Sequence, residues 1–126
     1  MNTEILSPEI LARYIIQRKH YRADGTVRHN AFMPSPAGEV SVYRITDLKE
    51  EQVWEIGRTN VAAALNKQLL GRADIIALCV FNQKLRVESD PKPHPRHANI
   101  VGWPIDQEKK KEIALVLAAE AQPHRI

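Results

Sequence analysis

The chain has 126 residues, of which 44% are hydrophobic and 26% are charged, and its formal net charge is +3. This size and balance are typical of one globular domain and exclude a chain that is disordered over most of its length. The longest apolar run, residues 75–81, is far shorter than the ~20 residues of a membrane-spanning helix. The N-terminal residues lack the apolar segment of a signal peptide, so we expect a cytoplasmic protein with no membrane partner.

The chain contains one cysteine, Cys79, which lies inside the apolar run. A single cysteine excludes an intrachain disulfide framework and a zinc site built from thiolates. We therefore expect Cys79 to be buried and unreactive, and we expect no cofactor.

The N-terminal part of the chain has the pattern of a helix. Ser7 followed by Pro8 is typical of a helix start, because serine caps the first turn and proline is tolerated there. The apolar residues that follow recur at helical spacing: Ile10, Leu11, Tyr14 and Ile15. The pattern predicts a first helix over residues 8–19. A weak strand over residues 26–32 and a proline-containing loop over residues 33–38 are expected next.

Residues 39–45 alternate as a strand does. One face carries Val40, Val42 and Arg44, and the other carries Ser41, Tyr43 and Ile45. If the valines face the core, Arg44 points inward as well. An inward arginine must pair with a carboxylate or bind an anion, because an unpaired buried charge is costly.

The second half of the chain is expected to alternate between helices and strands. Asp47 with Glu50 three residues later suits a capping box, and the helix expected to follow is interrupted at Gly57, continues over residues 60–70 and ends at Gly71. The nearly continuous apolar residues 73–81 predict a central buried strand.

Further strands are expected at residues 85–89, which form a hairpin with the preceding strand, and at residues 99–103. A last helix is predicted over residues 107–121. The fold class is therefore α+β: a mostly antiparallel sheet of about four to five strands packed by about three helices. We expect one domain over residues 1–126, with frayed ends at residues 1–6 and 122–126.

The segment 90–100 is the densest in chemically active residues. It contains three prolines, two histidines and two cations. Each proline fixes its own φ and favours extended backbone at the residue before it, so His94 and His97 are held on a stiff track. Imidazole can act as acid or base near neutrality, and a neighbouring cation can stabilise the charge that develops on a phosphate.

Candidate site residues follow from this segment and from the Arg28-His29 pair. The candidate catalytic residues are His97, His94 and His29. The candidate ligand-binding residues are Arg96, Arg28, Arg44, Lys92 and Trp103, the last as a lid over the histidines. Whether His29 meets His97 depends on the fold. The two histidines of the segment would also suit a metal ion together with Asp90 or His29, but this pattern is weak and no metal site is predicted.

Charge is unevenly distributed along the chain. Residues 10–30 carry five cations and one acid, a net charge of +4, and residues 39–55 carry five acids and two cations, a net charge of −3. Two function classes follow. The first is a histidine–arginine site that binds or acts on a phosphate-containing or nucleic-acid ligand. The alternative is a non-catalytic protein-binding module of the immunity, antitoxin or adaptor type. No pattern indicates an oligomeric state.

Overall fold

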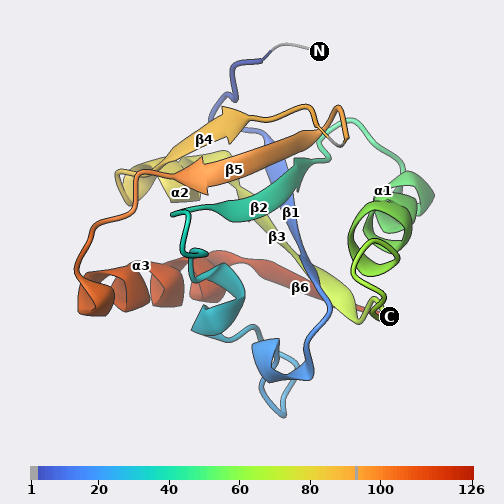
Figure 1. Ribbon diagram of the computed structural model, residues 1–126, viewed down its shortest axis with the longest axis horizontal. Coiled ribbons are helices and arrows are strands. Elements are labelled where there is room, and N and C mark those ends of the chain that lie inside the picture. Colours follow the sequence, from blue (N-terminus) through green and yellow to red (C-terminus); the bar gives the residue numbers. More distant parts are fainter. Residues whose placement is uncertain (1–2, 93) are drawn as a thin grey trace.

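The computed structural model describes residues 3–92 and 94–126, and its centre is one antiparallel sheet (Figure 1). The described chain forms six strands in the order β4-β5-β2-β1-β3-β6. Their bounds are β1 Ile10–Ile15, β2 Val40–Arg44, β3 Gly71–Ile76, β4 Arg86–Ser89, β5 His97–Val101 and β6 Gln122–Arg125. The α+β class, the antiparallel sheet and the three α-helices are confirmed, but the sheet has six strands instead of four or five.

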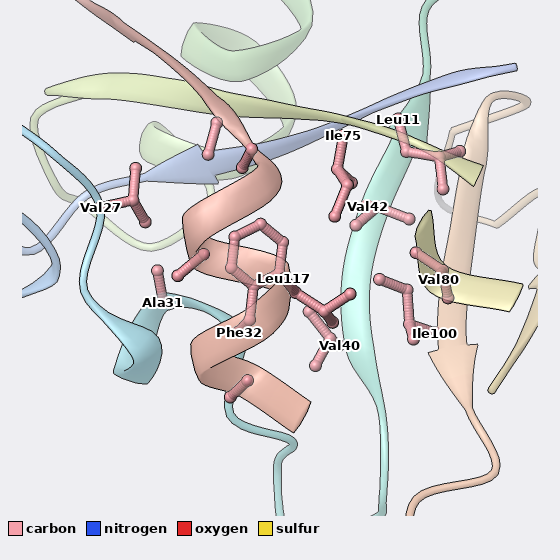
Figure 2. Packing of buried hydrophobic residues seen from close by; sticks show 14 of the residues in the cluster. Leu11, Val27, Ala31, Phe32, Val40, Val42, Ile75, Val80, Ile100 and Leu117 are labelled. Carbon is pink, nitrogen blue, oxygen red and sulfur yellow. The ribbon is translucent and has the colours of Figure 1, made fainter. Parts of the chain in front are cut away.

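One face of the sheet carries the larger hydrophobic core. It is covered by α2 (Ala77–Asn82), α3 (Gln107–Glu120) and a 3₁₀ turn, η2 (His29–Phe32). Figure 2 shows Phe32 of η2 and Leu117 of α3 packed among the valine and isoleucine side chains of the strands. Both residues are completely buried.

The opposite face is covered by α1 (Glu50–Ile56) and by the wider π-helical turn η3 (Gly57–Ala62) that continues it. Val53 and Ile56 of α1 pack against Tyr14 and Tyr43 of the sheet. The predicted interruption at Gly57 is only a change from α- to π-helical turns, because the backbone of Gly57 stays in the right-handed helical region. A residue with a Cβ does not fit there, since that Cβ would lie 2.6 Å from the Tyr14 ring.

The predicted helix over residues 8–19 is wrong, because residues 10–15 form β1 at the centre of the sheet. Leu11 and Ile15 belong to one core, and Ala12 and Tyr14 belong to the other. A strand that is buried on both faces loses its alternation, so its apolar residues can match helical spacing by chance.

The apolar run 73–81 is divided between two elements. β3 ends at Ile76 and α2 begins at Ala77, whose side chain packs on the core together with that of Val80. A short apolar run does not distinguish a buried strand from a buried helix, and this run contains both. The predicted strand over residues 26–32 is also replaced, in part by η2.

The C-terminal residues are ordered in a strand, contrary to the frayed end that we expected. β6 is an edge strand that pairs with β3 from Gln122 to Arg125. At the other end Ile5 is buried in the larger core. Among the helices of the described residues, none is both long and apolar enough to cross a membrane.

Candidate functional site: a cleft beside Arg13

The site begins where the two central strands separate. β1 pairs with β2 over only two positions, Leu11 with Arg44 and Ala12 with Tyr43. Beyond this point the guanidinium of Arg13, a residue of β1, forms hydrogen bonds to η2 and to β2. Its Nε donates to the Ala31 carbonyl at 2.8 Å, and its Nη1 donates to the Ser41 carbonyl at 3.1 Å.

Arg13 is partly buried, and within the described part of the chain no carboxylate forms an ion pair with it. Burial lowers the pKa of its guanidinium. The two buried arginines of the sheet differ in this respect. Arg44 pairs with Glu9 at 2.7 Å, and Arg72 pairs with Glu50 at 2.7 Å and with Asp74 at 3.0 Å. Arg44 and Arg72 thus have carboxylate partners in the described chain, and Arg13 has none there.

Two cavities adjoin this guanidinium, with volumes of about 320 and 350 Å³. Four residues line both of them: Arg13, Gln17, His20 and Ser41. We call the two cavities together the Arg13 cleft. Asn99 and the exposed Glu39 line the second cavity as well. The walls therefore combine a cation, a histidine, amides and a hydroxyl.

His20 is a buried residue in the wall of the Arg13 cleft. It is only 7% exposed, and its Nδ1 has no hydrogen-bond partner. Burial, followed by the charges of Arg13 and Lys19, lowers its pKa to about 4, so the ring is neutral at pH 7. Asn30, which lines the second cavity, has a buried Oδ1 that also lacks a partner. Leaving such atoms unsatisfied costs roughly 1–3 kcal/mol each.

Ser41 lies between the Arg13 cleft and His97. Ser41 Oγ is 2.6 Å from His97 Nε2, and His97 Nδ1 is 3.0 Å from the Asp90 carbonyl oxygen. A carbonyl can only accept, so Nδ1 carries a proton and donates it. In the neutral ring Nε2 is then the acceptor, and the Ser41 hydroxyl donates to it.

The ring of His97 packs against Tyr43, its cross-strand partner, with the ring centroids 5.3 Å apart. His94 contacts the same tyrosine ring at 5.9 Å. The structure therefore brings the two predicted histidines together on Tyr43. His94 also accepts the Arg96 backbone N–H at its Nδ1, 3.1 Å away. Burial, together with the neighbouring Arg96 and His97, lowers the pKa of His94.

His94 and Arg96 do not line the Arg13 cleft. They line a separate, open cavity of about 500 Å³ beside α1, which also contains Glu51 and Glu55. The Arg96 guanidinium is paired with Asp47, with 2.5 Å between Nη1 and Oδ1.

The structure places His29 and Arg28 away from the other predicted residues. His29 is in η2, on the face of the sheet covered by α3. Its pKa is lowered mainly by burial and further by the charges of Lys111, Arg22 and Arg28. Arg28 donates its Nε to the Tyr21 carbonyl at 3.2 Å.

The remaining predicted residues have separate positions. Arg44 points inward as the alternation predicted, and its anion is Glu9 of this chain. Lys92 is exposed. Trp103 packs against the larger core and donates its Nε1 to the Ile100 carbonyl at 3.1 Å, so it does not cover His97, whose side chain belongs to the other face.

Sequence reasoning did not select Arg13, His20 or Ser41. Arg13 fell inside a segment predicted as a helix, where an arginine is an ordinary surface residue. Ser41 was placed on the same face as Tyr43, which is confirmed, but its contact with His97 spans 56 residues of sequence. The one available signal was the cluster of five cations within residues 10–30.

Among residues 3–92 and 94–126, no group of three histidine, cysteine, aspartate or glutamate side chains could hold a metal ion. Comparison of the chain with protein-family models, curated proteins and solved structures finds no match.

Proposed function

We propose that the Arg13 cleft binds a phosphate-containing ligand, with Arg13 as the cation that receives the phosphate. The observation that carries this proposal is a partly buried guanidinium without an ion-pair partner in the described chain, in the wall of two cavities. Charges that are withdrawn from water are normally paired, and guanidinium donors match the oxygens of phosphate.

The neighbouring polar atoms support a phosphate ligand in particular. His20 stays neutral at pH 7, so it offers a hydrogen bond and no second charge. A phosphate group has ionised oxygens that accept hydrogen bonds, and a protonated oxygen can donate one. It can therefore bond to a ring nitrogen of His20 that faces the cleft in either tautomer.

The size of the cleft also agrees with a small ligand. Cavities of ~300–1,000 Å³ are typical of small-molecule sites, and the two here are about 320 and 350 Å³. Glu39 is exposed at the second cavity and would repel an anion beside it. We therefore place the phosphate next to Arg13 and His20 and away from Glu39.

Isothermal titration calorimetry with inorganic phosphate and with phenyl phosphate tests this proposal. Arg13→Met keeps the aliphatic stem and removes the charge, and it should weaken binding about tenfold to a hundredfold, as expected for a charged hydrogen bond. Arg86→Met is the matched control, because Arg86 is 66% exposed and lies outside the cleft. Equal affinity in the wild type and Arg13→Met would refute the proposal.

A second cationic cavity must be distinguished in the same experiment. Arg18, Arg22 and Arg125 line a cavity of about 490 Å³. If Arg22→Met abolishes phosphate binding and Arg13→Met does not, the phosphate site is that cavity and not the Arg13 cleft.

One observation favours the alternative, a protein-binding module. The open cavity beside α1 is lined by two exposed acids, Glu51 and Glu55, and by the apolar Leu48 and Ile56. Such a surface suits a basic partner segment with one apolar anchor. The double substitution E51K/E55K tests it without breaking the Glu50–Arg72 ion pair. Unchanged capture of a basic partner by this variant would exclude the surface as the interface.

A further inference from the structure

We propose that Ser41 is a nucleophile that His97 activates as a general base, and that the cleft therefore cleaves a phosphodiester that Arg13 binds. The orientation of the substrate rests on the proposed function. The reactivity of Ser41 does not, because it follows from the contacts of Ser41 and His97 alone.

The position of Ser41 is that of a group presented to a ligand. Its residue lines both cavities of the Arg13 cleft, and its hydroxyl bonds to His97, which lines neither. The residue that carries the hydroxyl is thus part of the wall of the cleft, and the residue that carries the base is outside that wall. The Ser41 backbone carbonyl accepts from Arg13, so the guanidinium lies against the backbone of Ser41, and both residues line the cleft.

The distance and the tautomer suit proton transfer. The Oγ to Nε2 distance of 2.6 Å is within the ~2.6–3.2 Å reach of a general base. Because Nδ1 donates to the Asp90 carbonyl, the lone pair of the neutral ring is at Nε2, where the hydroxyl proton must go.

The ring of His97 is held in place from two directions. Tyr43 packs against it edge-on, at 61° between the ring planes. The backbone of Asp90 forms two hydrogen bonds with His97. Its N–H donates to the His97 carbonyl at 2.9 Å, and its carbonyl accepts from His97 Nδ1. The Asp90 carboxylate is 3.4 Å from Nδ1 and also accepts from Asn99 at 3.3 Å. Asp90 is thus a positioning residue, and it lies where its charge stabilises a protonated imidazole.

The reaction balances without a co-reactant other than water. The Ser41 proton passes to His97 Nε2, a bond forms between Oγ and phosphorus, and the bond from phosphorus to the leaving oxygen breaks. The leaving oxygen takes the proton from Nε2. Water then attacks phosphorus and gives a proton to Nε2, the Oγ–phosphorus bond breaks, and Oγ recovers its proton. Arg13 stabilises the charge on the phosphoryl oxygens in both steps.

Diisopropyl fluorophosphate tests the nucleophile directly, because this neutral reagent phosphorylates activated serines and does not need Arg13 to bind it. Intact-protein and peptide mass spectrometry should show one diisopropylphosphoryl group, on Ser41. Ser41→Ala should remain unlabelled. Ser35→Ala is the matched control, since Ser35 lines the same cleft and has no histidine partner among its hydrogen bonds, and it should be labelled at the wild-type rate.

The role of His97 is read from the labelling rate. His97→Asn should lower the rate about a hundredfold or more. Asp90→Asn keeps the carbonyl that holds Nδ1 and removes only the charge, so its rate should fall by a smaller factor. Thermal melting of each variant reports whether the fold is intact, and a purely structural role for Asp90 would leave the labelling rate of a folded variant unchanged.

A second measurement keeps the proposal testable if His97→Asn does not fold. In Ser41→Cys, the introduced thiol should react with iodoacetamide faster than Cys79, whose pKa is raised by burial to about 11. Cys79 is therefore an internal reference within the same molecule. An introduced thiol that reacts no faster than Cys79 contradicts activation by His97.

The outcomes separate the two proposals. Labelling of Ser41 that depends on His97, without phosphate binding, supports the nucleophile and refutes the phosphate site. Phosphate binding that depends on Arg13, with no labelling of Ser41, overturns the nucleophile and leaves the binding site. Labelling at the same rate in the wild type and His97→Asn also overturns it.

Discussion

Ser41 of β2 and His97 of β5 are diagonal neighbours across an antiparallel strand pair, with 2.6 Å between the hydroxyl oxygen and Nε2. In the register of this pair, Ser41 lies opposite Asn99 and Tyr43 lies opposite His97. The ladder therefore determines which two side chains meet. Their geometry is set by strands at the centre of the domain and not by a surface loop.

Removal of Arg44 should destabilise the protein strongly. Arg44 is 5% exposed and pairs with Glu9 at 2.7 Å, so Arg44→Met leaves the largely buried carboxylate of Glu9 without this partner. We expect a loss of about 3–5 kcal/mol in the free energy of unfolding, measured by urea denaturation at pH 7. Arg86→Met, which removes an exposed ion pair, should cost no more than about 0.5 kcal/mol. A similar cost for the two variants would contradict this account of Arg44.

Two leucines of α3 should differ in their contributions to stability. Leu117 is completely buried in the larger core, and Leu115 is 40% exposed on the same helix. Leu117→Ala should lower the free energy of unfolding by about 2–5 kcal/mol because it leaves a cavity. Leu115→Ala has the same helix propensity change and should cost under about 1 kcal/mol. Equal losses of unfolding free energy in the two variants would contradict the packing of Leu117, rather than Leu115, against the sheet.

The stability of the protein should depend on the protonation of His20. Its pKa is about 4 in the folded protein and 6.5 in the unfolded chain. Between these values the unfolded chain binds a proton that the folded protein does not, so stability is lost as the pH falls from about 6.5 to about 4. The loss that belongs to His20 is at most roughly 3 kcal/mol.

The measurement for His20 is urea denaturation at pH 7 and pH 4 on the wild type and on His20→Asn. Carboxylates that also titrate in this range contribute equally to both proteins, so the difference between them isolates His20. The wild type should lose more stability than the variant on acidification. An equal loss in the two proteins would show that His20 is protonated in the folded state as readily as in the unfolded one.

Gly71 should not tolerate a side chain. A Cβ at this position would collide with the Tyr21 hydroxyl and with the His124 carbonyl of β6, which is backbone and cannot move aside. Gly71→Ala should cost about 1–3 kcal/mol and expose the C-terminal strand to proteolysis. Gly38→Ala is a useful comparison, because Gly38 has a positive φ of 79° and open space around it. If Gly71→Ala is less costly than Gly38→Ala, β6 does not pack as described.

The sequence predicted the parts of the fold where periodicity and burial agree. Residues 39–45 alternate Val40, Val42 and Arg44 with Ser41 and Tyr43, and this alternation identified both the strand and the inward direction of Arg44, although both faces of β2 are covered. The last helix, predicted over residues 107–121, is observed over residues 107–120 because its apolar stripe faces one core. β1 is buried on both faces too, but its apolar residues recur at helical spacing, and there the same method predicted a helix.

The candidate site was only partly predictable for a related reason. His94 and His97 are close in sequence and stay close in the structure, on the same tyrosine ring. Ser41 and Arg13 come from different strands, and only the pairing of these strands brings the two residues to one cleft. Trp103 was expected to cover the histidines, but its side chain packs against the core on the other face of β5.

The central claim is that a phosphate group binds at Arg13. NMR titration of the ¹⁵N-labelled protein with inorganic phosphate, observed at backbone amides and at arginine Nε, measures this most directly. We predict saturable shifts at the Arg13 Nε and at the amides of His20 and Ser41, all of which disappear in Arg13→Met. Shifts confined to Arg18, Arg22 and Arg125, or no saturable shift at the Arg13 Nε, would contradict the claim.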